Sequence, residues 1–316
     1  MKLLLTGSSG WLGRYLAPQL RAAGHEVVGL DVAPGAHTQI VGSVADAALV
    51  ESVVADGIEA IIHSGALHKP DIVRYPKQVF IDTNVTGTLN LLEAAVAAGH
   101  DRFVFTSTTS HMVSQRVRDG AQAEAFWMDE RFYDGPPRNI YGVTKAAAEG
   151  LCRLFAAERG LDVAILRTGR FFPEDDDTHH ALSGENLKAN EFLNRRLSAS
   201  DAARAHVVAL SGIAGLGCET FVLSAPIPFT RGEAGEMVRD ARAVIARHFP
   251  DADELYAARG WKLPEVIDRV YDPSKAERLL GFRCRTDFAS VLDAMRTGRP
   301  LPFDHDPSYL PPKELA

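Results

Sequence analysis

The sequence has few cysteines, no basic run and no long apolar run, and each absence excludes a class of protein. Its three cysteines, Cys152, Cys218 and Cys284, lie far apart without a CxxC pair, which argues against a disulfide framework or structural zinc and favours a reducing cytoplasm. No run of Lys or Arg reaches five residues and the net charge is −7, so we expect no nucleic-acid partner. No stretch approaches about 18 uninterrupted apolar residues, and the opening Met1–Leu5 is short for a signal peptide, so we expect a soluble chain without a membrane span.

The 316 residues, 46% hydrophobic and 24% charged, are enough for one large α/β domain or for a core with a smaller lobe. Short apolar runs alternate with longer segments of helical spacing. This alternation predicts a doubly wound parallel sheet with helices on both faces, because parallel strands need crossover connections. The predicted strands span 3–6, 26–31, 38–41, 60–63, 103–106 and 162–167, and the predicted helices 12–23, 47–55, 84–98 and 141–159.

A glycine-rich segment, Thr6-Gly7-Ser8-Ser9-Gly10-Trp11-Leu12-Gly13, follows the first predicted strand and opens a helix. Its glycines allow a tight turn, close approach of the backbone to a pyrophosphate and tight helix packing, while the helix N-terminus supplies amide donors. The segment therefore predicts a dinucleotide-binding loop.

Asp31 ends the second predicted strand, 21 residues after Gly10, where a carboxylate can accept hydrogen bonds from the adenosine ribose. The same carboxylate would repel a 2′-phosphate, and no Lys or Arg occurs between Arg21 and Lys69 to neutralise one. NAD is therefore favoured over NADP. The alternative is a solvated turn carboxylate before Pro34.

Tyr141 and Lys145 lie four residues apart at the start of a predicted helix, and hence on one face. A free phenol titrates near ~10, so acid or base chemistry near neutrality needs a pKa lowered by roughly 3, or ~4 kcal/mol of phenolate stabilisation. Lys145 and the charge of a nicotinamide could supply it. The alternative is a chance pair on a surface helix.

Taken together, the glycine loop, Asp31, Asn84 in TNVTGTLN, the Thr106-Ser107-Thr108 strand end and the YxxxK pair resemble the extended short-chain dehydrogenase/reductases, the NAD-dependent epimerase/dehydratase family. The resemblance covers Lys2 to about Leu292. It implies that Tyr141 is the acid/base, that Lys145 binds the nicotinamide ribose and lowers the pKa of the phenol, and that Thr108 orients the substrate oxygen, with Ser107 the alternative.

The resemblance also implies a set of cofactor contacts. Ser43 offers a hydroxyl where the family often has a carboxylate, and Asn84 either tethers the active-site backbone or a water, or is an ordinary helix N-cap. The predicted cofactor residues are Gly7, Ser9, Gly10, Trp11, Leu12, Gly13, Asp31, Ser43, Val44, Ser64, Gly65, Ala66, Asn84, Thr106, Tyr141 and Lys145.

The predicted substrate residues follow from departures from the family pattern. Arg170 stands where nucleotide-sugar epimerases usually carry an Asn, and the pattern RxGxxxPE from Arg167 to Glu174 is similar to uronate dehydrogenases, which oxidise free hexuronic acids to lactones. Arg195 and Arg196 either bind a substrate carboxylate or phosphate or form a solvated charge pair near Asp201. The predicted substrate set is Thr108, Ser110, Arg170, Arg195 and Arg196, while His111 lines the same pocket or lies on a surface loop.

Residues 1–168 are expected to form the NAD-binding Rossmann core, and residues 169–316 mainly a substrate-binding lobe, with a helix and strand at about 200–224 returning to the core. His179 and His180 beside Asp175–Asp177 do not have convincing metal-site spacing, so no metal is expected. By resemblance we expect a homodimer and an NAD-dependent oxidoreductase acting on a sugar or sugar acid. The alternatives are a nucleotide-sugar epimerase or dehydratase with tightly bound NAD, and a non-catalytic dinucleotide sensor.

Overall fold

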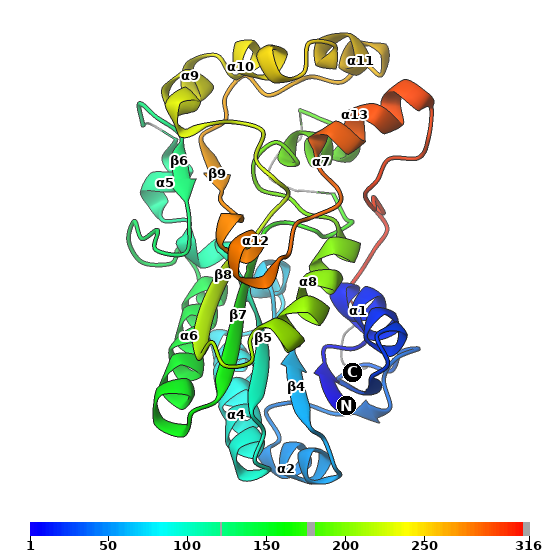
Figure 1. The fold of residues 1–316 in the computed structure, drawn as a ribbon, viewed down its shortest axis with the longest axis vertical. Helices are drawn as coiled ribbons and strands as arrows, with labels where there is room; N and C mark the ends of the chain where they lie inside the picture. Colours follow the sequence, from blue (N-terminus) through cyan, green and yellow to red (C-terminus); the bar gives the residue numbers. More distant parts are fainter. Residues whose placement is uncertain (121, 176–180, 312–316) are drawn as a thin grey trace.

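The protein, seen as a computed structural model that describes residues 1–120, 122–175 and 181–311, is built on a seven-stranded parallel sheet (Figure 1). The strand order is β3-β2-β1-β4-β5-β7-β8, so the order reverses between β1 and β4. In open α/β sheets the ligand crevice lies at such a reversal, outside the carboxyl ends of the strands. The predicted fold class is confirmed. The strands are β1 (Lys2–Thr6), β2 (Glu26–Asp31), β3 (Ile40–Val41), β4 (Ala60–His63), β5 (Arg102–Thr108), β7 (Asp162–Thr168) and β8 (Cys218–Leu223).

Helices cover both faces of this sheet. On one face α1 (Trp11–Ala22) and α8 (Ala199–Gly212) bury leucines and alanines against the strands. On the other face lie α2 (Ala47–Ala55), α4 (Gly87–Ala97) and α6 (Ile140–Arg159). The strands are apolar almost throughout because parallel strands are shielded on both sides.

The predicted helix 84–98 begins earlier than expected. α3 (Lys77–Ile81) continues through a π-helical turn, η2 (Asp82–Thr86), into α4 without a break. The predicted start at Asn84 is therefore wrong, and so is its alternative role as a helix N-cap, because Asn84 lies inside the π turn with its side chain buried. Such turns recur at functional sites.

A smaller lobe stands above the carboxyl edge of the sheet (Figure 1). There β6 (Phe126–Met128) pairs in parallel with β9 (Arg269–Tyr271), a strand pair absent from the predicted pattern. Its core contains Phe192, Tyr256 and Phe288. The remaining elements are η1 (Lys69–Val73), η3 (Thr109–Met112), α5 (Gln115–Asp119), α7 (Gly184–Glu191), η4 (Arg231–Glu233), α9 (Ala234–Arg239), α10 (Ala241–His248), α11 (Ala252–Ala258), α12 (Ser274–Leu280) and α13 (Phe288–Thr297).

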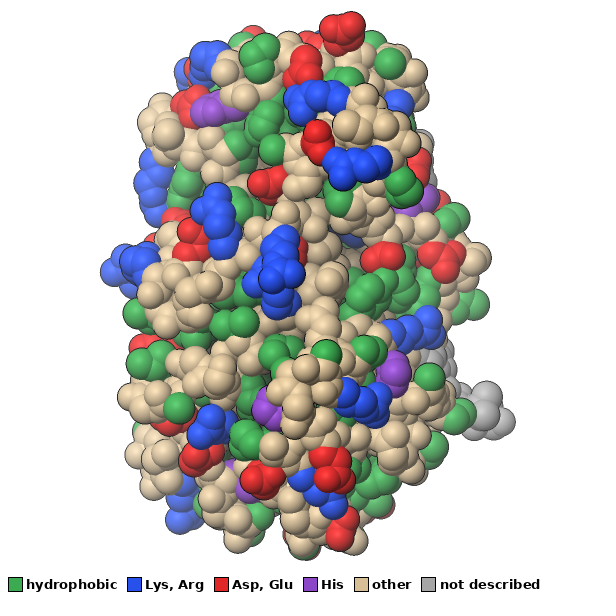
Figure 2. All heavy atoms as spheres, turned by 45° about the vertical axis from the view of Figure 1, so that its right-hand side comes forward, with side chains coloured by type: hydrophobic (Ala, Val, Ile, Leu, Met, Phe, Trp, Pro, Cys, Tyr) green, Lys and Arg blue, Asp and Glu red, His purple; other side chains and the backbone are tan. Residues whose placement is uncertain are grey.

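Charged side chains of both signs are interspersed over the face drawn in Figure 2, and no large basic field is visible there. In the described part of the chain, every helix is too short or too polar to cross a bilayer.

Candidate functional site

The glycine-rich loop joins β1 to α1 at the crevice. Gly7 has φ +73°, and a Cβ there would lie 2.7 Å from the amide nitrogen of Gly65 at the end of β4. A Cβ on Gly13 would lie 2.4 Å from the carbonyl oxygen of Gly7. The N-cap of α1 is Gly10, which offers no capping side chain, so the helix N-terminus is presented as bare backbone. This cradle fits a dinucleotide diphosphate, which needs close backbone approach and amide donors.

Asp31 lies at the carboxyl end of β2 and holds the glycine loop in place. Its carboxylate accepts the amide hydrogens of Ser9 and Ala33, each at 3.0 Å. Burial raises the pKa of Asp31, and these backbone hydrogen bonds oppose the rise. The alternative of a solvated turn carboxylate is therefore wrong. The position suits a carboxylate that meets a ribose at the crevice.

The side chains of several predicted cofactor residues form hydrogen bonds within the protein. The Ser64 hydroxyl donates to the carbonyl of Thr6 at 2.6 Å, and the Thr106 hydroxyl bonds the His206 ring at 2.7 Å. Ser43 accepts an amide hydrogen from Ala45. At these positions the side chains stabilise the strand ends, which leaves backbone groups to meet a ligand. Val44 is buried, while Gly65 and Ala66 are half-buried after β4.

Asn84 ties the loop after β4 to α6. Its side-chain oxygen accepts from the amide of Leu67 at 2.8 Å, while its side-chain nitrogen donates to the Leu67 carbonyl and to the Thr144 hydroxyl, both at 3.1 Å. Thr144 neighbours Lys145. Asn84 therefore tethers the backbone of the candidate active site, one of the two roles expected for it.

Tyr141 and Thr108 meet at the carboxyl edge of β5. Asn139 caps α6 by accepting the amide hydrogen of Gly142 at 3.0 Å, which fixes the helix start and points Tyr141 inward. Burial raises the pKa of Tyr141 to about 12, and a side-chain hydrogen bond with Thr108 opposes the rise. The expected lowering is not found in the chain alone, because desolvation disfavours the phenolate more than the hydrogen bond stabilises it.

Lys145 is only 3% exposed and its ammonium lies 3.9 Å from the ring centre of Phe105. Burial lowers the pKa of Lys145 to about 7, although Cys152 and Glu149 act in the opposite direction. An ammonium held over a buried ring is a weakly hydrated cation, and it can contribute strongly to the field at the crevice.

Glu149, one helical turn beyond Lys145, was not singled out from the sequence. Its carboxylate accepts from Ser107 at 2.7 Å, His111 at 2.8 Å, Arg167 at 2.8 and 2.9 Å, and Arg153 at 2.7 Å. The Ser107 hydroxyl is therefore engaged, which leaves Thr108 as the hydroxyl beside Tyr141. His111 is part of this buried network, so its surface-loop alternative is wrong. Ser110 is exposed and its amide donates to the Thr108 hydroxyl at 3.1 Å. The sequence signal that could have identified Glu149 is its position four residues after Lys145, on the same face of the helix.

The three predicted substrate arginines converge on one buried carboxylate. Glu191 of α7 lies 3.0 Å from Arg170, 3.1 Å from Arg195 and 2.9 Å from Arg196. Arg196 is 1% exposed and also donates to the carbonyl of Phe172 at 2.7 Å. The alternative of a solvated pair near Asp201 is wrong, since Asp201 pairs with Arg204 instead.

Within the described residues no group of His, Cys, Asp or Glu has the geometry of a metal site. Asp176, Asp177, His179 and His180 lie outside those residues.

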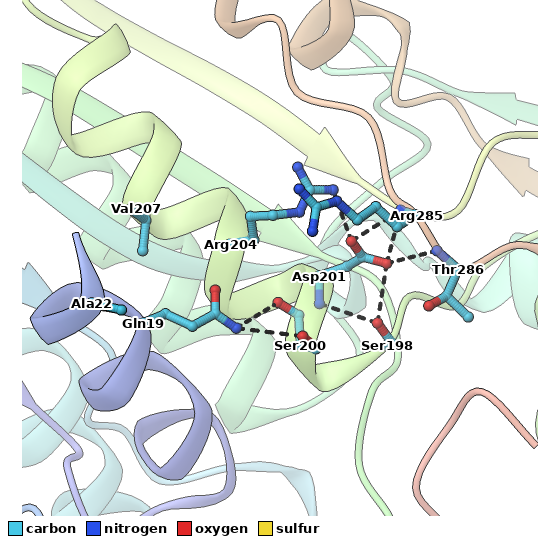
Figure 3. A pocket seen from close by; sticks show the side chains of 9 residues that line it. All are labelled: Gln19, Ala22, Ser198, Ser200, Asp201, Arg204, Val207, Arg285 and Thr286. Atoms are coloured by element: carbon cyan, nitrogen blue, oxygen red, sulfur yellow. Dashed lines mark hydrogen bonds and ion pairs between the residues drawn. The ribbon is translucent and has the colours of Figure 1, made fainter. Parts of the chain in front are cut away.

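A surface hollow of about 510 Å³ lies between α1 and α8, apart from the glycine loop (Figure 3). In it Asp201 accepts from Ser198, Arg204 and the amides of Arg285 and Thr286, so its carboxylate is satisfied within the protein.

Comparison with known proteins finds relatives over about half of this chain. The UDP-glucose 4-epimerase of Rhizobium meliloti is 32% identical over 173 residues, 52% of this chain and 50% of that protein. The uronate dehydrogenase of Agrobacterium fabrum is 31% identical over 185 residues, 56% of this chain and 63% of that protein. The L-arabinose 1-dehydrogenase of Haloferax volcanii is 31% identical over 186 residues, 55% and 69% of the two chains. The match thus spans about half the length of the first of these curated relatives.

Solved structures share the fold over nearly the whole chain. The UDP-N-acetylglucosamine 4-epimerase of Bacillus cereus superposes with a TM-score of 0.64 at 21% identity, covering 94% of this chain and 98% of that one. The model of the NAD dependent epimerase/dehydratase family matches residues 3–214. The chain belongs to the NAD dependent epimerase/dehydratase family, and NAD is its cofactor.

Proposed function

We propose that this chain is an oxidoreductase that transfers a hydride from a hydroxyl-bearing carbon of a sugar or sugar acid to NAD. The observation that carries the proposal is the contact of Tyr141 with Thr108, at the same carboxyl edge as the glycine loop and with Lys145 buried one turn along α6. Relatives named uronate dehydrogenase and L-arabinose 1-dehydrogenase support this reading. The alternatives stay a nucleotide-sugar epimerase or dehydratase and a non-catalytic sensor.

The proposed chemistry needs one set of residues that holds the cofactor and another that takes the proton of the substrate hydroxyl. Gly7, Gly10 and Gly13 with the amides of α1 hold the diphosphate, and Asp31 accepts from the adenosine ribose. NAD, when bound, supplies the hydride acceptor. The substrate hydroxyl lies against the Thr108 hydroxyl and the Tyr141 oxygen. As the carbon loses hydride and becomes a carbonyl, the substrate oxygen gives its proton to the Tyr141 oxygen.

In its protonated form Lys145 would supply a positive field that favours the phenolate of Tyr141. Its low-dielectric surroundings strengthen that field. Glu149, Ser107 and Arg167 position the strand end that carries Thr108.

A sugar acid is the substrate class favoured by the arginine cluster. The guanidiniums of Arg170, Arg195 and Arg196 all pair with the carboxylate of Glu191, and Arg170 closely follows the end of β7. Arg170 retains a 22% exposed side chain, which is where an incoming carboxylate would meet the cluster.

The test combines a substrate panel with one variant. Free uronates and aldoses are incubated with NAD, and NADH absorbance is followed. We expect net NADH from a uronate, and loss of turnover by at least about a hundredfold in Tyr141→Phe with NAD affinity nearly unchanged. A UDP-sugar turned over without NADH release would favour the epimerase reading. NAD binding without turnover of either class would favour the sensor.

We also propose that residues 1–168 mainly hold the cofactor and 169–316 mainly the substrate, although β6 of the first part pairs with β9 of the second. A homodimer through α4 and α6 is proposed because α6 exposes Val143 and Leu154 at 48% and 47%. The thiols Cys152, Cys218 and Cys284 are free, which suits a reducing cytoplasm.

A further inference from the structure

The chain after α13 returns from the small lobe to the glycine-rich loop (Figure 1). We call residues 303–309 the strap. Its first part is anchored on the small lobe: the ring of Phe303 lies 5.5 Å from that of Phe192, and the Asp306 amide donates to the carbonyl of Pro173 at 2.9 Å. The Lys188 ammonium lies 3.1 Å from the His305 ring nitrogen. Hydrophobic packing and hydrogen bonds therefore fix this part of the strap.

The last residue of the strap, Tyr309, lies on the N-terminus of α1. Its ring centre is 5.0 Å from that of Trp11, edge to face, and the Arg14 guanidinium lies 5.4 Å from it. The backbone amide of Trp11 acts on the phenol and lowers its pKa. Tyr309 thus engages the segment whose amides the glycine loop presents to a diphosphate.

Charges on both sides of the crevice act on the same phenol. Burial raises the pKa of Tyr309 to about 12; Arg14 lowers it, and the carboxylates of Glu174 and Asp31 raise it. Asp31 marks the adenosine end of the crevice. A dinucleotide that extends from Asp31 to Lys145 has to cross the N-terminus of α1, where Tyr309 lies.

We propose that the hydroxyl of Tyr309 takes the place of a cofactor phosphate oxygen at the Trp11 amide, so that the end of the strap must leave α1 before NAD binds. This inference rests on the dinucleotide site of the proposed function. A phosphate is the stronger acceptor because a charge-assisted hydrogen bond exceeds a neutral one. NAD can therefore displace Tyr309 while Phe303 and Asp306 keep the rest of the strap in place.

The experiment measures the dissociation constants of NAD, ADP-ribose and adenosine for the full chain and its Tyr309→Ala variant. Removing one competing hydrogen bond is expected to lower the dissociation constant of NAD about fivefold. ADP-ribose should show the same gain because it carries the diphosphate. Adenosine should show none, since it reaches only the Asp31 end.

Tyr309→Phe keeps the ring and removes the acceptor, so it should shift NAD affinity in the same direction by a smaller factor even if Tyr309→Ala folds poorly. Tyr133→Ala is the matched control, because Tyr133 is 80% exposed and outside the strap. An unchanged or weaker affinity in both Tyr309 variants, or an equal gain for adenosine, would overturn the proposal. If neither wild type nor variants bind NAD, the dinucleotide site itself is refuted along with the strap. Equal NAD binding by all of them refutes the strap alone.

Discussion

Glu149 shows how one residue can organise the floor of the candidate site. The side chain is almost fully buried, and desolvation alone would favour its protonated form. Hydrogen bonds from His111 and Arg167 reverse this and hold the pKa of Glu149 well below its usual range. The carboxylate thereby links α6 to the ends of β5 and β7, on which Thr108 and Thr168 lie.

Replacing Glu149 by Gln should destabilise the protein by roughly 3–5 kcal/mol, because the Arg167 charge stays buried without its counter-charge. The native pKa lies below the unfolded value, so this stabilisation is present above about pH 4.5 and is lost as the pH falls. Urea unfolding at several pH values measures it. Glu158→Gln, on the exposed side of the same helix, is the control and should stay within about 0.5 kcal/mol of wild type. Equal losses in the two variants would contradict the network.

Tyr141 should show no phenolate below about pH 10 in the chain alone, since burial raises its pKa to about 12. Added NAD brings a positive nicotinamide ring, which should move this titration toward neutrality. The difference in phenolate absorbance between wild type and Tyr141→Phe follows the group directly. A titration unaffected by NAD would place Tyr141 away from the nicotinamide.

At the scale of elements, local patterns predicted what depends on local chemistry. The strand at 60–63 and the helix predicted at 141–159 follow from an apolar run and from helical spacing. The π turn at 82–86 could not be predicted, because helical spacing does not reveal one extra residue per turn. Nor could the ion pair of Glu191 with Arg170, since the two meet only after the chain has folded back, whereas Arg195 lies four residues after Glu191 at a spacing that the sequence does show. The sequence identified the three arginines but not their shared partner.

The β1–α1 turn depends on one close approach between backbone segments, which gives a prediction at the same scale. Gly13→Ala places a methyl group 2.4 Å from the Gly7 carbonyl oxygen, so the turn must open. We expect a loss of roughly 1–3 kcal/mol in unfolding free energy and a weakened affinity for NAD. Calorimetric titration and urea unfolding measure the two effects. Gly232→Ala, whose added Cβ meets its nearest atom at 3.8 Å, is the control. NAD affinity equal to that of the control would show that this turn does not hold the diphosphate.

In the whole molecule, the small lobe lies over the carboxyl edge of the sheet and is built from segments that are distant in the sequence. The Trp11 indole donates to the Phe171 carbonyl at 3.1 Å, which ties the glycine-rich loop to the segment after β7. Together with the strap, this contact links the two parts directly at the cofactor end. Contacts outside the sheet therefore join the small lobe to the dinucleotide loop.

The exposed face of α6 is the proposed interface of the homodimer. Val143, Ala147, Gly150 and Leu154 are exposed at helical spacing on α6, and together they form one small, apolar stripe. A two-fold axis would pair this stripe with itself, so Leu154→Glu would bring two carboxylates into each interface. Burying them costs several kcal/mol, and we expect dimerisation to weaken by at least about a hundredfold. Light scattering after size exclusion should give twice the chain mass for wild type and for Leu216→Glu, a control 40% exposed between α8 and β8. A monomeric wild type, or a Leu154→Glu variant as dimeric as this control, would rule out α6 as the interface.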